Sequence, residues 1–159
     1  DDLIKAARIY VENKTGIGLF TQTVVQRWDE FPNISAHNPF GALRLSEGEI
    51  QSITHLKYVD TDGATATLVT TTDYIEDLID TPPKLVPAYS KAWPATRNQP
   101  NAVWSEYVRG WSATADIPQQ LKSAMLILVN TWFECRHDSI RRFPSTVDLL
   151  LEDYKMHTP

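Results

Sequence analysis

The chain has 159 residues and a mass of 18.1 kDa, the size of one ordinary domain. Its 42% apolar and 22% charged residues are typical of a globular protein and exclude disordered, collagen-like and coiled-coil chains. The net charge of −5 argues against a protein whose main task is to bind nucleic-acid phosphates, because that task needs clustered Lys and Arg. The longest apolar run, Ala124 to Val129, is far shorter than the roughly 20 residues of a membrane span, so we expect no membrane partner.

An amphipathic helix over residues 2 to about 14 is the first predicted element. Ala7 and Val11 stand four residues apart on its apolar face, and Gly16 is placed where a C-terminal cap ends a helix. The β-favouring residues from Phe20 to Trp28 then predict a strand.

Residues 33–48 predict a long irregular segment, and a loop of that length in a compact domain usually has a function or is mobile. Next, Ile53–Val59 and Thr65–Val69 predict a β-hairpin, because the Asp-Gly pair between them favours a tight turn. The sequence Asp60 to Gly63 also looks like half of a calcium loop, but the later oxygen ligands are missing and the hairpin turn explains it better.

Three further strands are predicted, at Tyr74–Leu78, Lys84–Val86 and Ala102–Gly110. The last of them has apolar residues on both faces, with Trp104 and Val108 on one side and Val103 and Tyr107 on the other. Both faces therefore need partial cover. A second sheet of the same chain or a neighbouring subunit of an oligomer would each supply it.

The C-terminal third has a helical period. Asp116 is the predicted N-cap, with Gln119 as its capping-box partner and Pro118 in the first turn. Apolar residues from Leu121 to Trp132 then recur at the spacing of a helix that packs on a core, and Ser145 begins a last short helix.

Together these elements predict one α+β domain over residues 1–159. Residues 1–16 and 117–154 would form a small helical core, and residues 20–111 a β-rich insertion. The order of elements shows no βαβ alternation.

Residue patterns typical of catalysis or metal binding are absent from the sequence. None of the four histidines stands in a zinc-binding spacing, and the Cys135-Arg136-His137 neighbourhood lacks the further ligands of a metal site. Cys135 is expected to be inert, and the basic group of Arg136, Arg141 and Arg142 to complement a helix end. The sequence also lacks a glycine-rich phosphate loop and a nucleophile elbow, so we expect no enzymatic activity, cofactor or metal.

The residues from Trp93 to Val103 read W-P-A-T-R-N-Q-P-N-A-V, and the strand after them ends in Gly110-Trp111. This pattern resembles the W-P-x-x-R-x-x-P-N-A-V segment of the head-tail connector proteins, also called adaptor or head-completion proteins, of long-tailed bacteriophages and gene transfer agents. The opening from Ala6 to Thr23, the hairpin from Ile53 to Gly63, and the helix after Ile117-Pro118 are similar to elements of the same family.

The resemblance implies a small helical bundle with a β-rich insertion and a ring of this chain, commonly of twelve subunits, docked beneath the portal. Such a ring lies in the virion neck after assembly in the host cytoplasm. It extends a channel through which DNA passes without specific binding, and it offers a platform to a stopper or tail-completion protein. Another neck or tail protein and a monomeric protein-binding module remain alternatives.

In relatives the C-terminal segment often docks against the portal, so apolar and basic residues near the C-terminus are candidate anchors. Terminal residues are also often frayed, which is the competing interpretation. The C-terminal candidates are Tyr154, Lys155, Met156 and His157. Phe40 of the irregular segment and Arg97 of the W-P-x-x-R pattern are two further candidate interface positions.

Overall fold

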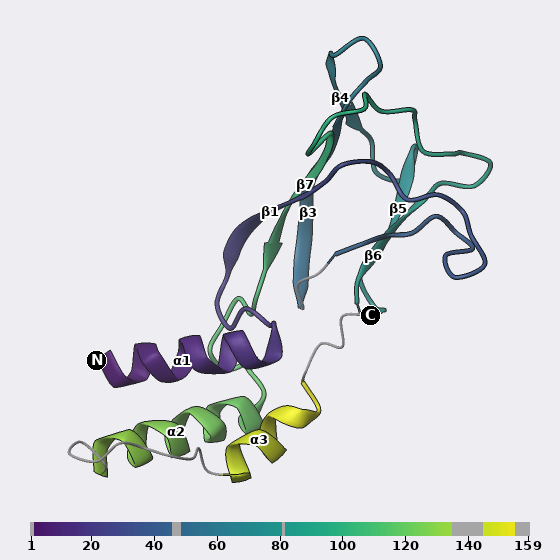
Figure 1. Ribbon diagram of the computed structural model, residues 1–159. Helices are drawn as coiled ribbons and strands as arrows, with labels where there is room; N and C mark the ends of the chain where they lie inside the picture. Colours follow the sequence, from purple (N-terminus) through teal and green to yellow (C-terminus); the bar gives the residue numbers. More distant parts are fainter. Residues whose placement is uncertain (1, 46–48, 81, 135–144, 155–159) are drawn as a thin grey trace. The chain divides into compact units, whose positions relative to one another are not determined.

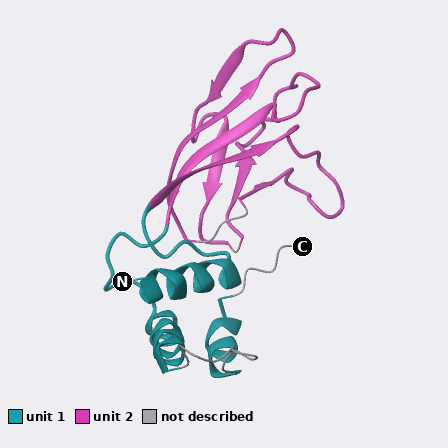
Figure 2. Ribbon diagram, turned by 60° about the vertical axis from the view of Figure 1, so that its left-hand side comes forward, with its two compact units in different colours: residues 1–21, 110–159 teal, residues 22–109 magenta. Residues whose placement is uncertain are grey.

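The structure is a computed structural model, and its description covers residues 2–45, 49–80, 82–134 and 145–154 (Figure 1). The chain divides into two compact units (Figure 2). The helical unit comprises residues 1–21 and 110–159, and the β unit comprises residues 22–109. Helices together with antiparallel sheets confirm the predicted α+β fold.

The helical unit contains α1 (Asp2–Thr15), α2 (Gln119–Glu134) and α3 (Ser145–Glu152). Helix α1 ends as predicted, since the Gly16 N–H donates to the Glu12 carbonyl over 2.8 Å and Gly16 has a φ of 74°. The three helices share one hydrophobic core, to which each contributes fully buried side chains. These are Ala7 and Val11 of α1, Leu121, Ala124 and Leu128 of α2, and Val147 and Leu151 of α3.

The start of α2 differs from the prediction. The helix begins at Gln119, and the Pro118 carbonyl accepts the Lys122 N–H over 3.3 Å, so Pro118 occupies the capping position. Asp116 lies two residues before Pro118, in a separate turn in which its N–H donates to the Ala113 carbonyl. The predicted Asp116 cap is wrong because it would require Ile117 to be helical, and a residue before proline is driven out of the helical region.

The β-rich part is shorter than predicted at both ends. Phe20 and Trp111 form an isolated bridge, and the Thr21 hydroxyl donates to the Trp111 carbonyl over 3.2 Å. Residues 20–21 and 110–111 therefore belong to the helical unit rather than to the insertion. This bridge requires glycine at 110, because its φ is 91° and a Cβ there would lie 2.2 Å from the Phe20 carbonyl oxygen.

The β unit contains two antiparallel sheets. The four-stranded sheet has the order β1-β7-β3-β4 and the three-stranded sheet the order β2-β6-β5. The strands are β1 (Gln22–Trp28), β2 (Leu43–Arg44), β3 (Ile50–Val59), β4 (Thr65–Leu68), β5 (Tyr74–Asp77), β6 (Lys84–Pro87) and β7 (Val103–Arg109). The predicted hairpin is the β3–β4 pair, whereas the two-residue strand β2 lies in the segment predicted to be irregular.

Both sheets contribute to one core. Leu56, Val103 and Tyr107 of the four-stranded sheet are fully buried with Leu43 and Leu85 of the other sheet. A second sheet therefore covers one face of β7, as the first of the two alternatives predicted.

Tyr107 at the centre of this core keeps its hydroxyl partnered, because it donates to the Gln26 side-chain oxygen over 3.1 Å. Burial raises the pKa of Tyr107 to about 12. In the described residues no helix is long and apolar enough to span a membrane.

Replacing Leu128 by alanine is expected to destabilise the protein by about 2–5 kcal/mol, because the side chain is fully buried between the helices. Leu126→Ala on the same helix is the matched control, since Leu126 is 67% exposed and its loss should cost less than about 0.5 kcal/mol. Urea unfolding followed by circular dichroism measures both variants. Equal unfolding midpoints for the two variants would contradict the packing described for α2.

Candidate functional site

The residues from Trp93 to Val103, which carry the family resemblance, hold three parts of the β unit together. The Trp93 ring stacks on Phe31 with 4.7 Å between centroids and 5° between planes. The Trp93 indole N–H also donates to the Gly41 carbonyl over 2.6 Å. The half-buried Trp93 thus holds Phe31, which precedes the irregular segment, and Gly41 within it, so its role here is structural.

Arg97 connects the Trp93 to Val103 motif to the tip of the β3–β4 hairpin. Its backbone N–H donates to the Val59 carbonyl over 3.1 Å, and its guanidinium lies against Gly63. Gly63 has a φ of 94°, and a Cβ there would lie 2.4 Å from the Arg97 Nη1 atom. Of the predicted Asp-Gly pair, Gly63 therefore supplies the positive φ of the turn.

The hairpin turn itself is closed by an aspartate. The Asp60 carboxylate accepts the N–H groups of Asp62 and Ala64 over 3.0 and 2.8 Å. This explains the Asp60 to Gly63 sequence as an Asx-type turn rather than half of a calcium loop.

Asn101 completes the motif at the start of β7. It adopts a left-handed φ of 56°, and its N–H donates to the Asp29 carboxylate over 2.9 Å. The next carbonyl, that of Ala102, accepts the Val59 N–H over 2.8 Å. The motif therefore sets where β7 enters the sheet between the ends of β1 and β3.

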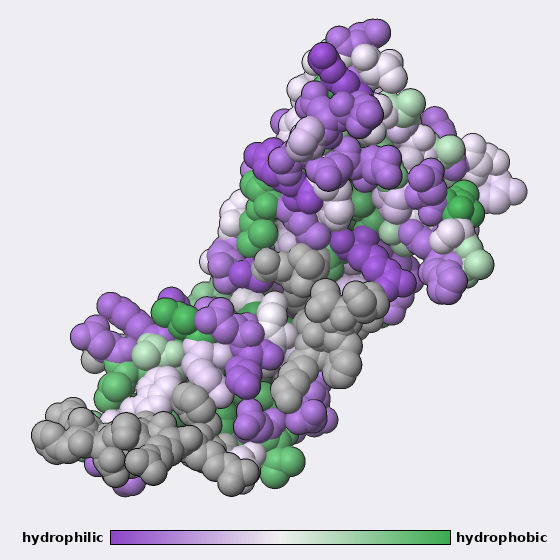
Figure 3. All heavy atoms as spheres, in the orientation of Figure 1, coloured by the Kyte–Doolittle hydropathy of each residue, from purple (hydrophilic) through white to green (hydrophobic). Residues whose placement is uncertain are grey.

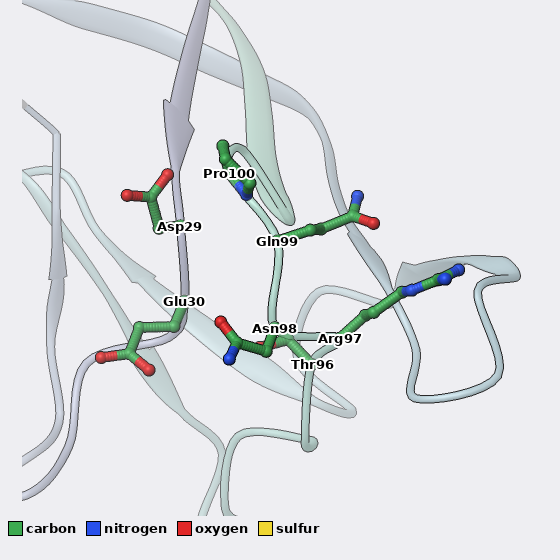
Figure 4. A pocket seen from close by; sticks show the side chains of 7 residues that line it. All are labelled: Asp29, Glu30, Thr96, Arg97, Asn98, Gln99 and Pro100. Atoms are coloured by element: carbon green, nitrogen blue, oxygen red, sulfur yellow. The ribbon is translucent and has the colours of Figure 1, made fainter.

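A surface hollow of about 470 Å³ lies along this motif (Figure 4). Its lining residues are polar or charged apart from one proline, and they are Asp29, Glu30, Thr96, Arg97, Asn98, Gln99 and Pro100. In Figure 4 the Arg97 side chain extends away from the two carboxylates, so the charged groups do not converge on one point. The hollow has the character of an open polar recess in a protein surface.

Phe40 lies on the irregular segment and is 67% exposed, and Ile34 on the same segment is 72% exposed. The segment is nevertheless fixed, because the Asn38 side chain accepts the Ala42 N–H over 2.7 Å and donates to the Ala42 carbonyl over 3.1 Å. A rigid loop thus presents two apolar side chains to solvent. Most of the β-unit surface visible in Figure 3 is hydrophilic, and apolar patches on it are small.

Tyr154 follows α3 and is half-buried against the core of the helical unit. Its N–H donates to the Leu151 carbonyl over 3.1 Å. Part of the Tyr154 ring therefore supports the three-helix core.

The other C-terminal candidates, Lys155, Met156 and His157, lie outside the described residues. The neighbourhood Cys135-Arg136-His137 and the arginines Arg141 and Arg142 also lie outside them. Across the described parts of the chain, no three His, Cys, Asp or Glu side chains come together as metal ligands would.

The partner of Trp93 is not predicted by the sequence. Phe31, on which Trp93 stacks, lies 62 residues away along the chain. The aromatic residues of the motif were a signal that something packs there, but the sequence did not identify the partner.

Comparison with known proteins finds a likeness of fold. No family model and no curated protein matches the chain. Three solved structures match 99% of the chain at 18% sequence identity. They are a chain in the virion of a native gene transfer agent particle (TM-score 0.72, 77% of that chain covered), one in the neck of the native particle computed with C12 symmetry (0.71, 82%), and one in the neck of the empty particle computed with C6 symmetry (0.73, 78%).

Shortening the Trp93 side chain in two steps should separate its two contacts. Trp93→Phe keeps a ring on Phe31 and loses the hydrogen bond to Gly41, which should cost about 1 kcal/mol of stability. Trp93→Ala loses both contacts and should cost about 2–3 kcal/mol, less than a fully buried tryptophan because Trp93 is half-buried. Urea unfolding of both variants measures the difference, and equal costs would show that the stacked ring contributes nothing.

Proposed function

We propose that this chain is a structural subunit of a head-tail connector, the ring that joins the portal of a phage-like particle to its tail. One observation carries the proposal: a fold match over 99% of the chain to neck components of a gene transfer agent particle. The resemblance of the Trp93 to Val103 segment to the connector pattern supports it independently. Both support the virion neck as the proposed location. Assembly in the host cytoplasm is part of the proposal.

A ring of twelve copies is the proposed assembly. The neck structures that this fold resembles were computed with C12 and C6 symmetry, both of which are compatible with twelve subunits around one axis. Cyclic symmetry of this order requires head-to-tail contacts between unlike surfaces. We expect the free chain to be largely monomeric, because acidic subunits repel one another until a portal ring concentrates them.

The proposed partners are the portal ring on one side and a stopper or tail-completion protein on the other. The C-terminal segment from Tyr154 to His157 is the proposed portal anchor. Because Tyr154 also packs against the core of the helical unit, only part of its side chain is available for this role. Exposed Phe40 and the Arg97 guanidinium belong to the proposed platform for the next neck protein. The Trp93 hydrogen bond to Gly41 holds the chain beside Phe40, and the Arg97 N–H bond to the Val59 carbonyl holds the backbone of Arg97. The proposed role is structural and includes no catalytic step.

DNA is proposed to pass through the channel without binding. In the β unit, residues 22–109 contain 11 Asp and Glu against 7 Lys and Arg, so most of the negative charge of the chain lies there. A wall of this charge gives phosphates no favourable site at which to stop.

Duplex DNA should bind the isolated chain with a dissociation constant no tighter than roughly 10⁻⁴ M at physiological salt, the weak end of non-specific binding. A fluorescence-anisotropy titration of labelled duplex at several salt concentrations measures this. Micromolar affinity that falls steeply with added salt would contradict the proposed passive channel.

Removing the C-terminal segment tests the portal anchor. A chain that ends at Tyr154 keeps the core contact of this residue and should fold normally, but should lose co-sedimentation with portal rings. The substitution Leu126→Ala in the full chain is a control that leaves the segment in place. If the shortened chain folds by circular dichroism and still binds portal rings at full stoichiometry, the anchor lies elsewhere.

A further inference from the structure

The four-stranded sheet has a second face, opposite the shared core, which we call the outer face. In the register of β1, β7 and β3, one row of directly paired residues is Val25, Glu106 and His55. The next row is Arg27, Trp104 and Lys57. Directly paired residues share a face, and neighbours of these rows such as Ser105 and Val103 are buried on the other side.

The outer face is basic although its unit is acidic. The two rows contain two cations, Arg27 and Lys57, and a histidine, His55, against one carboxylate, Glu106. The Arg27 guanidinium lies 5.8 Å from the centre of the Trp104 ring, which holds this charge over an aromatic surface. Val25, on the edge strand β1, is 45% exposed, so charge and apolar surface occur together on this face.

A second surface of the same unit has the opposite character. Residues 77–80, which we call the acidic knob, leave the end of β5 and carry Ile79 with 97% of its surface exposed. Asp77 and Asp80 flank this isoleucine, and the single amine of Lys84 is paired with both of them, at 3.5 Å from Asp77. Two carboxylates on one lysine leave the knob negatively charged and fixed in place.

We propose that the acidic knob of one copy docks on the outer face of a second copy. Ile79 would lie against Val25 and Trp104, while the carboxylates of Asp77 and Asp80 meet Arg27 and Lys57. Charge complementarity favours this occupant, since the knob offers negative charge to the two cations of the face and an apolar side chain to its exposed apolar surface. A DNA backbone would bring no apolar group to lie against Val25 and Trp104.

Within one chain this contact does not form, because the knob belongs to the sheet that packs on the inner side of the four-stranded sheet. Between copies it joins two unlike surfaces, so each copy still offers one free knob and one free face. Such a heterologous contact closes into a ring when the rotation permits. The inference rests on the proposed ring and names the surfaces that form it.

Paramagnetic relaxation measured by NMR detects this contact even when it is weak. A nitroxide is attached to Ile79→Cys in a chain in which the native Cys135 is serine, and this chain is mixed with a ¹⁵N-labelled copy. Amide signals of Val25, Arg27, Lys57 and Trp104 in the labelled copy should lose intensity, and added salt should restore them. The matched control places the nitroxide at Ile34→Cys, an exposed isoleucine on a loop without flanking carboxylates.

The double variant Arg27→Glu, Lys57→Glu in the ¹⁵N-labelled copy should abolish the intensity loss. The dispersion of its other amide signals should show that the variant is still folded. Losses that are equal for both nitroxide positions, that fall on other surfaces, or that are absent at every concentration would overturn the proposed contact. Rings that form on a portal without this contact would leave the proposed function intact and refute only the interface. Binding of duplex DNA to the outer face, seen as shifts of the same amides, would overturn the choice of a second copy.

Discussion

The pairing of β7 with β1 on one side and β3 on the other determines both surfaces of the β unit. Val103, Ser105 and Tyr107 face the core in this register, which leaves Trp104 and Glu106 on the outer face. A slip of one residue would exchange the two sets and bury Glu106. The Trp93 to Val103 segment fixes this register, because Asn101 and Ala102 are hydrogen-bonded to Asp29 and Val59 where β7 begins.

Sequence periodicity was sufficient for elements whose stability is local. The α2 stripe of Leu121, Ala124 and Leu128 is buried as predicted, since helical spacing directly gives the buried face. Helix α2 begins at Gln119 rather than after Asp116, because the steric effect of Pro118 on Ile117 outweighs the preference of Asp116 for a cap position. Strand β2 was missed because two residues carry no period, and only pairing with β6 defines it.

The Trp93 to Val103 segment could be recognised in the sequence, but the geometry of its contacts could not. Its residues contact the loop that contains Phe31 and Gly41 and the tip of the β3–β4 hairpin. What the sequence could not supply were partners distant along the chain, such as Phe31 and Gly41 for Trp93. Tyr154 shows the same limit, because an apolar residue near a chain end looks like an anchor until its own core is known.

The two units differ in charge as well as in structure, and a connector would use that difference. The helical unit is nearly neutral while the β unit carries most of the acidic excess, so repulsion between copies is concentrated in the sheets. Electron cryo-microscopy of this chain mixed with portal rings tests whether the chain is a connector subunit. We expect a coaxial ring of the chain on one face of the portal, with cyclic symmetry compatible with twelve copies. A single bound copy per portal, or no bound density, would contradict the connector role.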